Sequence, residues 1–193
     1  MLETVIIVGA YLIGSLSSAI ILCKLAGLPD PRTQGSGNPG ATNVLRFGGK
    51  KLAATVLALD VVKGILPVVI AMLFGMNEVD LAVTALAAFL GHLYPLFFQF
   101  KGGKGVATAL GGFLALSPLL AGAILLSWLI VFKVSRISSL SAILAASLAP
   151  VYSLWFINSS DARWIILVIA ILLVARHHGN IKRLLSGEEG QSK

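Results

Sequence analysis

Long apolar stretches separated by short polar loops fill most of this chain, and they restrict its fold more than any other feature. Residues 52–74 are a clear example, because a helix needs about 20 apolar residues to cross a bilayer. Similar stretches cover residues 4–25, 81–100, 106–132, 140–157 and 164–175. Only 12% of the residues are charged, against about 25% in soluble domains. We therefore expect an all-α integral membrane protein with a single domain over residues 1–193.

The number of spans depends on residues 106–132, which form either one long span or a hairpin that turns at Ser117-Pro118. The positive-inside rule favours the hairpin. It places all 15 Lys and Arg residues except Arg163 and Lys63 at the cytoplasmic face. We therefore expect seven transmembrane helices, with the N-terminus outside, the C-terminus cytoplasmic, and the fourth and fifth helices short. The first stretch lacks a basic n-region and a clear cleavage site, so we expect it to be retained.

Residues 35–43 form the first polar motif, Gly-Ser-Gly-Asn-Pro-Gly-Ala-Thr-Asn. Glycines let backbone N–H groups approach an anion. A short helix over residues 41–47, stopped by Gly48, would offer its N-terminus to a phosphate, and Arg46 would add a charge-assisted hydrogen bond. The candidate phosphate ligands are Gly35, Ser36, Gly37, Asn38, Gly40, Thr42 and Asn43. The alternative is a flexible interhelical loop. A dinucleotide site is excluded, because no strand is expected before these glycines.

The second motif is the loop of residues 101–105, Lys-Gly-Gly-Lys-Gly. Its glycines again free the backbone, and Lys104 offers a compact positive charge for an anion. It is not a Walker A loop, because no Ser or Thr follows the lysine. The alternative is a basic anchor at the membrane interface, which suits Lys101 better than Lys104. The candidate ligands here are Gly102, Gly103, Gly105 and Thr108.

The third motif, residues 177–189, follows the last apolar stretch. His177 and Asn180 are three residues apart, so they share one face of a helix. The alternative is a basic juxtamembrane tail that binds anionic lipid. Adjacent histidines point about 100° apart on a helix, so they do not form a metal site. A lone cysteine, Cys23, excludes an intrachain disulfide.

Three further groups of polar residues have open interpretations. Asp60 and Lys63 lie inside an apolar stretch and can pair on one helix face, either structurally or for a substrate. His92 is expected to be a packing residue. The serines beside Arg136 either bind a polar head group or cap the next helix; they are Ser138, Ser139 and Ser141.

Together, the three motifs resemble the PlsY family of bacterial, acyl-phosphate-dependent glycerol-3-phosphate acyltransferases. The matching stretches are residues 35–43 with Arg46, residues 101–112, and the pattern His177-x-x-Asn180-Ile181-x-Arg183-Leu184-x-x-Gly187-x-Glu189. The resemblance covers essentially the whole chain. It implies transfer of a fatty acyl group from acyl phosphate to the 1-hydroxyl of glycerol 3-phosphate, giving 1-acyl-glycerol 3-phosphate (lysophosphatidate) and phosphate. It also implies that neither acyl-CoA nor acyl carrier protein is the donor.

The resemblance also implies roles for individual residues. The expected catalytic residues are Lys104, Arg46, His177 and Asn180. The expected substrate ligands are the residues of the two glycine loops together with Thr108, Ser141, Arg183 and Glu189. Whether His177 is a general base or a hydrogen-bonding partner stays open, as does which loop binds which phosphate.

The partners and location follow from the same resemblance. We expect acyl phosphate, glycerol 3-phosphate and the phospholipid bilayer as partners, together with the soluble enzyme that makes acyl phosphate. No metal, cofactor or nucleic acid is expected. The net charge of +7 comes from Lys and Arg at the ends of the spans. The expected place is the bacterial cytoplasmic (inner) membrane, with the active site on the cytoplasmic side and a role in phospholipid synthesis.

A membrane transporter of an organic phosphate is the main alternative function. Its best support is the Asp60–Lys63 pair inside a span. Such a transporter predicts inverted repeats, and no convincing internal repeat is present. A scaffold protein is a weaker alternative, since it leaves the three polar motifs unexplained.

Overall fold

Helices make up nearly all of the structure, a computed structural model that describes residues 1–190. The α-helices are α1 Leu2–Gly14, α2 Ser18–Leu25, α3 Ala41–Leu73, α4 Glu78–Leu93, α5 Val106–Leu116, α6 Pro118–Ser135, α7 Ser138–Phe156, α8 Ser160–Arg176 and α9 His178–Leu185. Two 3₁₀ turns, η1 Pro31–Thr33 and η2 Leu96–Phe98, lie in the connections. The described residues contain no strand.

The lengths of these helices fit a membrane. Four of them, α3, α4, α6 and α7, are long and apolar enough to cross a bilayer. Two bent pairs, α1 with α2 (44°) and α8 with α9 (56°), raise the number of candidate spans to six if each pair is one span, and α5 is a shorter apolar helix. Large apolar side chains such as Val134 and Trp155 are exposed on the outside of the bundle, as lipid contact requires. The expectation of an all-α membrane protein is confirmed, and seven spans with this orientation stay a prediction.

The hairpin of residues 106–132 forms as expected, at Ser117-Pro118. The Ser117 hydroxyl accepts a hydrogen bond from the Leu120 N–H, and Pro118 is the first residue of α6, where a proline fits best. The prediction of a short fifth helix is wrong, because of the two helices in this hairpin only the first, α5, is short, with 11 residues against 18 in α6. Helix α6 continues through Lys133, a cation that its C-terminus favours, and ends where Arg136 adopts a positive φ of 59°.

Two other apolar stretches form helices that are shorter than the stretches themselves. Residues 4–25 break between α1 and α2, so the Leu16 carbonyl is free to accept a hydrogen bond from Lys63 (2.9 Å). Residues 81–100 leave the α-helix at Leu93, because Pro95 disfavours helical geometry at Tyr94. Helix α3, in contrast, begins before its apolar run, and Gly49 (φ 80°) separates a short first segment from the span. That break lies one residue after the expected stop at Gly48.

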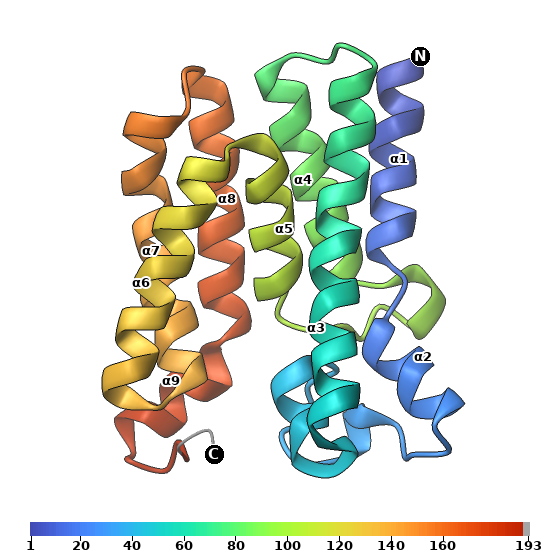
Figure 1. The fold of residues 1–193 in the computed structure, drawn as a ribbon, viewed down its shortest axis with the longest axis vertical. Coiled ribbons are helices and arrows are strands. Elements are labelled where there is room, and N and C mark those ends of the chain that lie inside the picture. The colour runs from blue at the N-terminus through green and yellow to red at the C-terminus, as the bar shows by residue number, and fades with distance from the viewer. Residues whose placement is uncertain (191–193) are drawn as a thin grey trace.

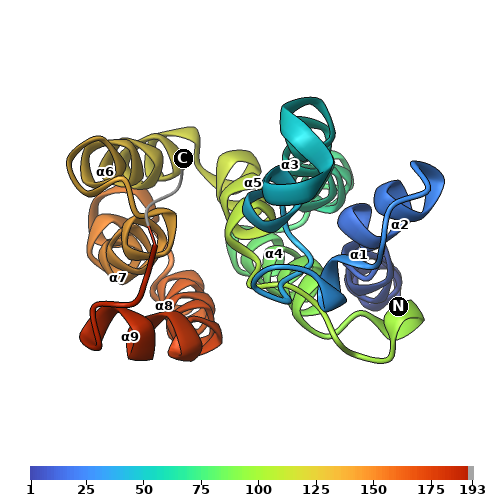
Figure 2. The same ribbon diagram turned by 90° about the horizontal axis from the view of Figure 1, so that it is seen from below.

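The helices form two groups that meet along one side (Figures 1 and 2). Helices α1 to α5 make one group and α6 to α9 the other, and the groups touch through α4 with α8 and α5 with α6. Within the first group, α3 and α5 pack closely because a Cβ atom on Gly64 or Gly111 would collide with the backbone of the opposite helix. Small residues allow such close approach in membranes.

The three polar motifs gather toward one end of the bundle. The connection from α2 to α3, the residues just before α5, and α9 all lie toward the lower end in Figure 1, away from the N-terminus. The α3–α4, α5–α6 and α7–α8 connections lie at the opposite end. The fold therefore brings together residues that are up to about 150 positions apart in sequence, from Gly35 to Glu189.

Candidate active site

The first glycine loop is held in shape by Asn43. The Asn43 amide donates to the carbonyls of Pro31 and Gln34, both at 2.9 Å, and its oxygen accepts from the Ser36 N–H at 2.9 Å. Its side chain is buried, so Asn43 supports the loop from beneath. Gly35 and Gly37 have positive φ angles (53° and 69°), as expected.

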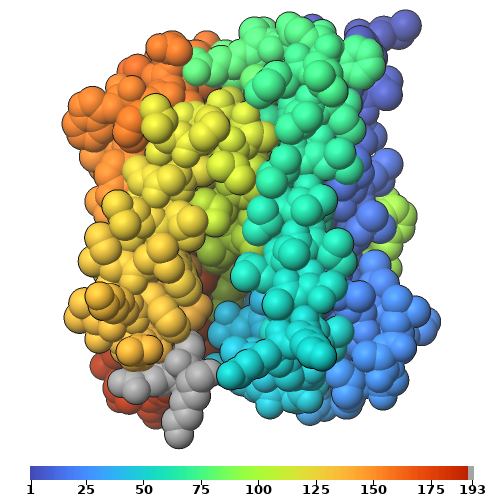
Figure 3. Space-filling model, in the orientation of Figure 1, coloured from blue at the N-terminus to red at the C-terminus, as the bar shows by residue number. Residues whose placement is uncertain are grey.

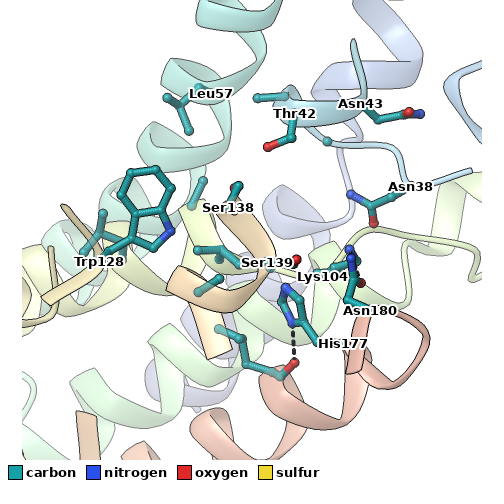
Figure 4. A pocket seen from close by; sticks show the side chains of 18 of the residues that line it. Asn38, Thr42, Asn43, Leu57, Lys104, Trp128, Ser138, Ser139, His177 and Asn180 are labelled. Carbon is teal, nitrogen blue, oxygen red and sulfur yellow. Dashed lines mark hydrogen bonds between the residues drawn. The ribbon is translucent and has the colours of Figure 1, made fainter. Parts of the chain in front are cut away.

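The end of this loop presents a helix N-terminus. Gly40 is extended (φ −148°) and precedes α3, and no side chain caps that end. The first backbone N–H groups of a helix lack intrahelical partners and favour an anion. Thr42 is exposed beside them, and Arg46 is exposed further along the same helix. In Figure 4, Asn38 and the Thr42 hydroxyl point toward the space below this loop.

The second glycine loop is fixed on two sides. The N–H groups of Gly102 and Gly103 donate to the carbonyls of Leu93 and His92, both at 3.2 Å. On the other side, the Arg176 guanidinium donates to the carbonyl oxygens of Gly102 (3.0 Å) and Gly103 (3.1 Å). The loop therefore has little freedom, and Lys104 projects from a defined backbone.

Gly105 completes this loop and begins α5. It has a positive φ of 83° and leaves the N-terminus of α5 without a side-chain cap. A second helix N-terminus therefore lies beside Lys104, and the N-termini of α3 and α5 border the same cavity.

Lys104 belongs to a chain of short hydrogen bonds that includes the third motif. Its ammonium donates to the Asn180 Oδ1 at 2.6 Å, and the Asn180 Nδ2 donates to Glu189 at 2.6 Å. Glu189 also accepts from the Ser139 hydroxyl (2.6 Å) and the Arg183 Nε (2.6 Å). Asn180 therefore links the third motif to the second glycine loop.

The charged groups in this chain of hydrogen bonds have shifted pKa values. Burial lowers the pKa of the Lys104 ammonium to about 8, against the opposing effect of Glu189. Burial alone would raise the pKa of Glu189, but hydrogen bonds from Ser139, Asn180 and Arg183 outweigh it and lower that pKa below its usual value. At neutral pH, a cationic Lys104 therefore lies near an ionised Glu189.

His177 lies where α8 turns into α9, and it is 2% exposed. Its Nδ1 is 2.8 Å from the Leu173 carbonyl oxygen (Figure 4). A carbonyl only accepts, so Nδ1 carries the proton and Nε2 is the free acceptor of the neutral ring. Burial lowers the pKa of His177 to about 4, despite the bond to Leu173. The ring is therefore neutral at pH 7.

These groups line the polar end of a cavity of about 1000 Å³. Its other walls are mostly apolar and come from α3, α5, α6, α7 and α8, with Leu57, Phe113 and Trp128 among them. Asp60 and His92 are the polar exceptions. Figure 3 shows this cleft between the surfaces of α3 and α6. A smaller cavity of about 210 Å³ adjoins it. Both are lined by Ser36, Asn38, Lys104, Asn180 and Arg183.

Most of the expected site residues meet at these cavities. The larger one is lined by Gly35, Ser36, Asn38, Gly40, Thr42, Asn43, Arg46, Lys104, Gly105, His177, Asn180, Arg183 and Glu189. Gly37 and Gly102 line the smaller one.

Three expected ligands do not line either cavity. Gly103 contacts His92 instead. The Thr108 hydroxyl is 3.3 Å from the His92 ring, and the Ser141 hydroxyl donates to the Ile137 carbonyl of its own helix (2.8 Å). Each of these hydroxyls has a partner within the protein.

Sequence reasoning missed two contributors. Ser139 donates to Glu189, whereas the sequence-based prediction selected its neighbour Ser141. Arg176, the first residue of the basic segment after the last apolar stretch, holds the second glycine loop and lies 5.6 Å over the Tyr94 ring. No spacing or composition separates Arg176 from the other cations at the ends of spans.

Comparison with known proteins identifies the family of this chain. A family model described as glycerol-3-phosphate acyltransferase matches residues 4–187. The chain belongs to the glycerol-3-phosphate acyltransferase family. A glycerol-3-phosphate acyltransferase of Shewanella halifaxensis is 55% identical over 98% of this chain and 94% of its own. One from Shewanella oneidensis is 52% identical over 98% and 93%.

Two solved structures show the same architecture. Both are crystal structures of PlsY, an integral membrane glycerol 3-phosphate acyltransferase. The glycerol 3-phosphate form superposes with a TM-score of 0.94 at 43% identity, covering 99% of this chain and 96% of that one. The lysophosphatidic acid form gives 0.92 at 42%, covering 99% and 95%. The PlsY resemblance is therefore confirmed for the fold and the family.

Proposed function

We propose that this acyltransferase moves a fatty acyl group from acyl phosphate to the 1-hydroxyl of glycerol 3-phosphate. The products are 1-acyl-glycerol 3-phosphate and inorganic phosphate. The observation that carries the proposal is one cavity with two chemically different ends. Its polar end holds two uncapped helix N-termini and Lys104, and its apolar body lies between helices that face lipid.

The two ends suit the two parts of acyl phosphate. A volume of about 1000 Å³ is at the upper end of the range for small-molecule sites, as a long acyl chain requires. The chain would enter from the bilayer between α3 and α6. Its phosphate would then meet the backbone N–H groups of a glycine loop, together with the charges of Lys104 and Arg46.

The smaller cavity suits glycerol 3-phosphate. It is polar, shares Lys104, Asn180 and Arg183 with the larger cavity, and adds Arg176. An arginine binds a phosphate with a planar pair of donors. The PlsY structures are a glycerol 3-phosphate form and a lysophosphatidic acid form, which supports glycerol 3-phosphate as the acceptor and its acylated form as the product.

The reaction needs positioning and charge stabilisation more than activation, because acyl phosphate is already a reactive donor. The acceptor hydroxyl oxygen attacks the acyl carbonyl carbon, and the carbonyl oxygen becomes an oxyanion. Lys104 and the N–H groups at the start of α5 stabilise that negative charge. The bond from carbon to the phosphate oxygen then breaks, and phosphate leaves.

The hydroxyl proton goes to a phosphate rather than to His177. A phosphate monoester has a second pKa near 6, so its dianion is a stronger base than an imidazole whose pKa is lowered to about 4. His177 instead accepts a hydrogen bond through Nε2 and orients glycerol 3-phosphate together with Asn180. No residue needs to form a covalent intermediate in this scheme.

The setting of the reaction is also proposed. The chain would act as a single acyltransferase domain of seven spans in the bacterial inner membrane, with its polar end at the cytoplasm. There it would meet the soluble enzyme that makes acyl phosphate. Family membership favours this reading over an organic-phosphate transporter.

An assay of purified protein with different donors tests the proposal. Radiolabelled glycerol 3-phosphate should be acylated with acyl phosphate, in the presence of a chelator and without coenzyme A. Acyl-CoA and acyl carrier protein should give no product. Product with acyl-CoA alone would contradict the proposed donor, and loss of activity on chelation, restored by a divalent metal, would contradict the cofactor-free scheme.

A further inference from the structure

Five buried polar residues form a cluster in the membrane interior, beneath the second glycine loop. The residues of this interior polar cluster are Ser18, Asp60, Lys63, His92 and Thr108, and each is less than a tenth exposed. They come from four helices, α2, α3, α4 and α5. The reaction scheme above uses none of them.

Asp60 is the centre of this cluster. Its Oδ1 accepts from the Ser18 hydroxyl at 2.7 Å, pairs with the Lys63 ammonium at 2.9 Å and lies 3.6 Å from the His92 Nδ1. Lys63 also donates to the Leu16 carbonyl at the break between α1 and α2. Charges inside a membrane are costly and usually functional. A buried ion pair is weak evidence of stability, so its presence calls for another role.

His92 connects the cluster to the loop that carries Lys104. Its Nδ1 faces Asp60 and the Thr108 hydroxyl. The opposite edge of the ring faces Gly103, because a Cβ atom there would collide with Nε2. The His92 carbonyl also accepts from the Gly103 N–H at 3.2 Å. The imidazole therefore lies between the membrane interior and the loop.

The loop is thus clamped from both sides. Arg176 holds its carbonyl oxygens from the polar side, and His92 supports Gly103 from the membrane side. Lys104 is the next residue, and its ammonium reaches Asn180 at 2.6 Å. A ring that tilts would move Gly103 and, with it, the position of the ammonium.

We propose that His92, oriented by Asp60 and Thr108, is a positioning residue that sets the place of the Lys104 ammonium. Lys63 pairs with Asp60 at 2.9 Å, and Asp60 faces the ring from the side of the membrane interior at 3.6 Å. The inference rests on the proposed role of Lys104. A displacement of about 1 Å can cost roughly a hundredfold in rate, so a small tilt of the ring would affect catalysis.

The first test compares two variants at position 92. His92→Leu removes the polar contacts and should lower kcat/KM about 10- to 100-fold. His92→Asn places an amide near the site of Nδ1 and should recover at least a third of the wild-type value. Thr84→Val is the matched control, because Thr84 is fully buried on the same helix and donates only within it. It should keep wild-type activity.

The second test separates positioning from stability. Asp60→Leu/Lys63→Met removes both charges with side chains of similar shape, so no unpaired charge is buried. Such replacements are often neutral or stabilising. The double variant should unfold in detergent at or above the wild-type temperature, yet lose at least tenfold in kcat. A merely structural pair cannot give a heat-stable, inactive protein.

Lys104→Ala, measured in the same assay, separates the two claims. Full activity of Lys104→Ala would overturn the proposed function of the loop. If Lys104→Ala is inactive, two results would overturn only the positioning role of His92. One is a wild-type kcat/KM in His92→Leu, and the other is an equal loss of kcat/KM in His92→Leu and His92→Asn. A wild-type kcat in Asp60→Leu/Lys63→Met would also overturn the positioning role.

Discussion

At the scale of single residues, Lys104 carries most of the proposed chemistry. It lies between two glycines, at the N-terminus of α5 and 2.6 Å from Asn180. Loss of one donor to a developing oxyanion typically costs about 2.7–4 kcal/mol, or roughly a hundred- to a thousandfold in kcat. We expect Lys104→Ala to lose that much activity and to fold and insert normally, as measured by kcat and by gel filtration in detergent.

The neighbouring Lys101 is the matched control for that experiment. It is exposed and lines neither cavity, so Lys101→Ala should keep at least half of the activity. Lys104→Arg should recover little, since a planar guanidinium does not replace a compact ammonium at this position. Equal losses in Lys101→Ala and Lys104→Ala would show that the loop is only an interfacial anchor.

The lowered pKa of Lys104 predicts a pH dependence. The protonated ammonium is the active form, so activity is present below a pH of about 8 and falls as the pH rises through that value. The fall should appear in kcat/KM, which reports the free enzyme. Lys101→Ala should show the same falling limb. A kcat/KM that stays constant to pH 10 would contradict a catalytic ammonium with this pKa.

Residue types and their spacing predict the chemistry of the site well, but they predict the direction of each side chain less well. Lys104, His177 and Asn180 meet at the cavity as their motifs suggest. Thr108 and Ser141 do not, because each lies on a helix face that turns toward protein partners. A one-residue shift on a helix rotates a side chain by about 100°, and only packing decides which serine faces the cavity.

At the scale of elements, the start of α5 places both the loop and a helix N-terminus. Gly105 has a φ of 83°, and a Cβ atom there would collide with the Phe89 ring. Gly105→Ala should therefore lower kcat at least tenfold and reduce the unfolding temperature. Gly75→Ala is matched in strain, with a φ of 73° but open space around it. That control should cost about 1–2 kcal/mol of stability with unchanged kcat, and equal kcat in the two variants would contradict the placement argument.

The all-α architecture was easier to predict from the sequence than the ends of the helices. The turn at Ser117-Pro118 was predictable from proline chemistry and from the distribution of positive charge. The break between α1 and α2 was not, since Ser15, Ser17 and Ser18 look like small residues that suit close helix packing within one apolar run. At that break the Leu16 carbonyl accepts a hydrogen bond from Lys63, a tertiary contact that no local pattern reveals.

At the scale of the whole molecule, the cavity exists because two groups of helices meet along one side only (Figure 2). The sequence predicts that three polar motifs share one membrane face, and the structure places them together. It does not predict the apolar wall, because Leu57, Ala146 and Trp128 look like ordinary membrane residues. Their inward direction follows from how α3, α6 and α7 pack.

The central claim is that the acyl chain of the donor occupies this cavity with its phosphate at Lys104. A non-hydrolysable acyl phosphonate with a photoreactive group near the end of its chain tests it directly, with labelled residues identified by mass spectrometry. We predict labels on cavity residues such as Leu57 and Trp128, competed by acyl phosphate and weakened in Lys104→Ala. Labels confined to outward-facing residues such as Trp155 and Trp164, unaffected by competition, would contradict the account.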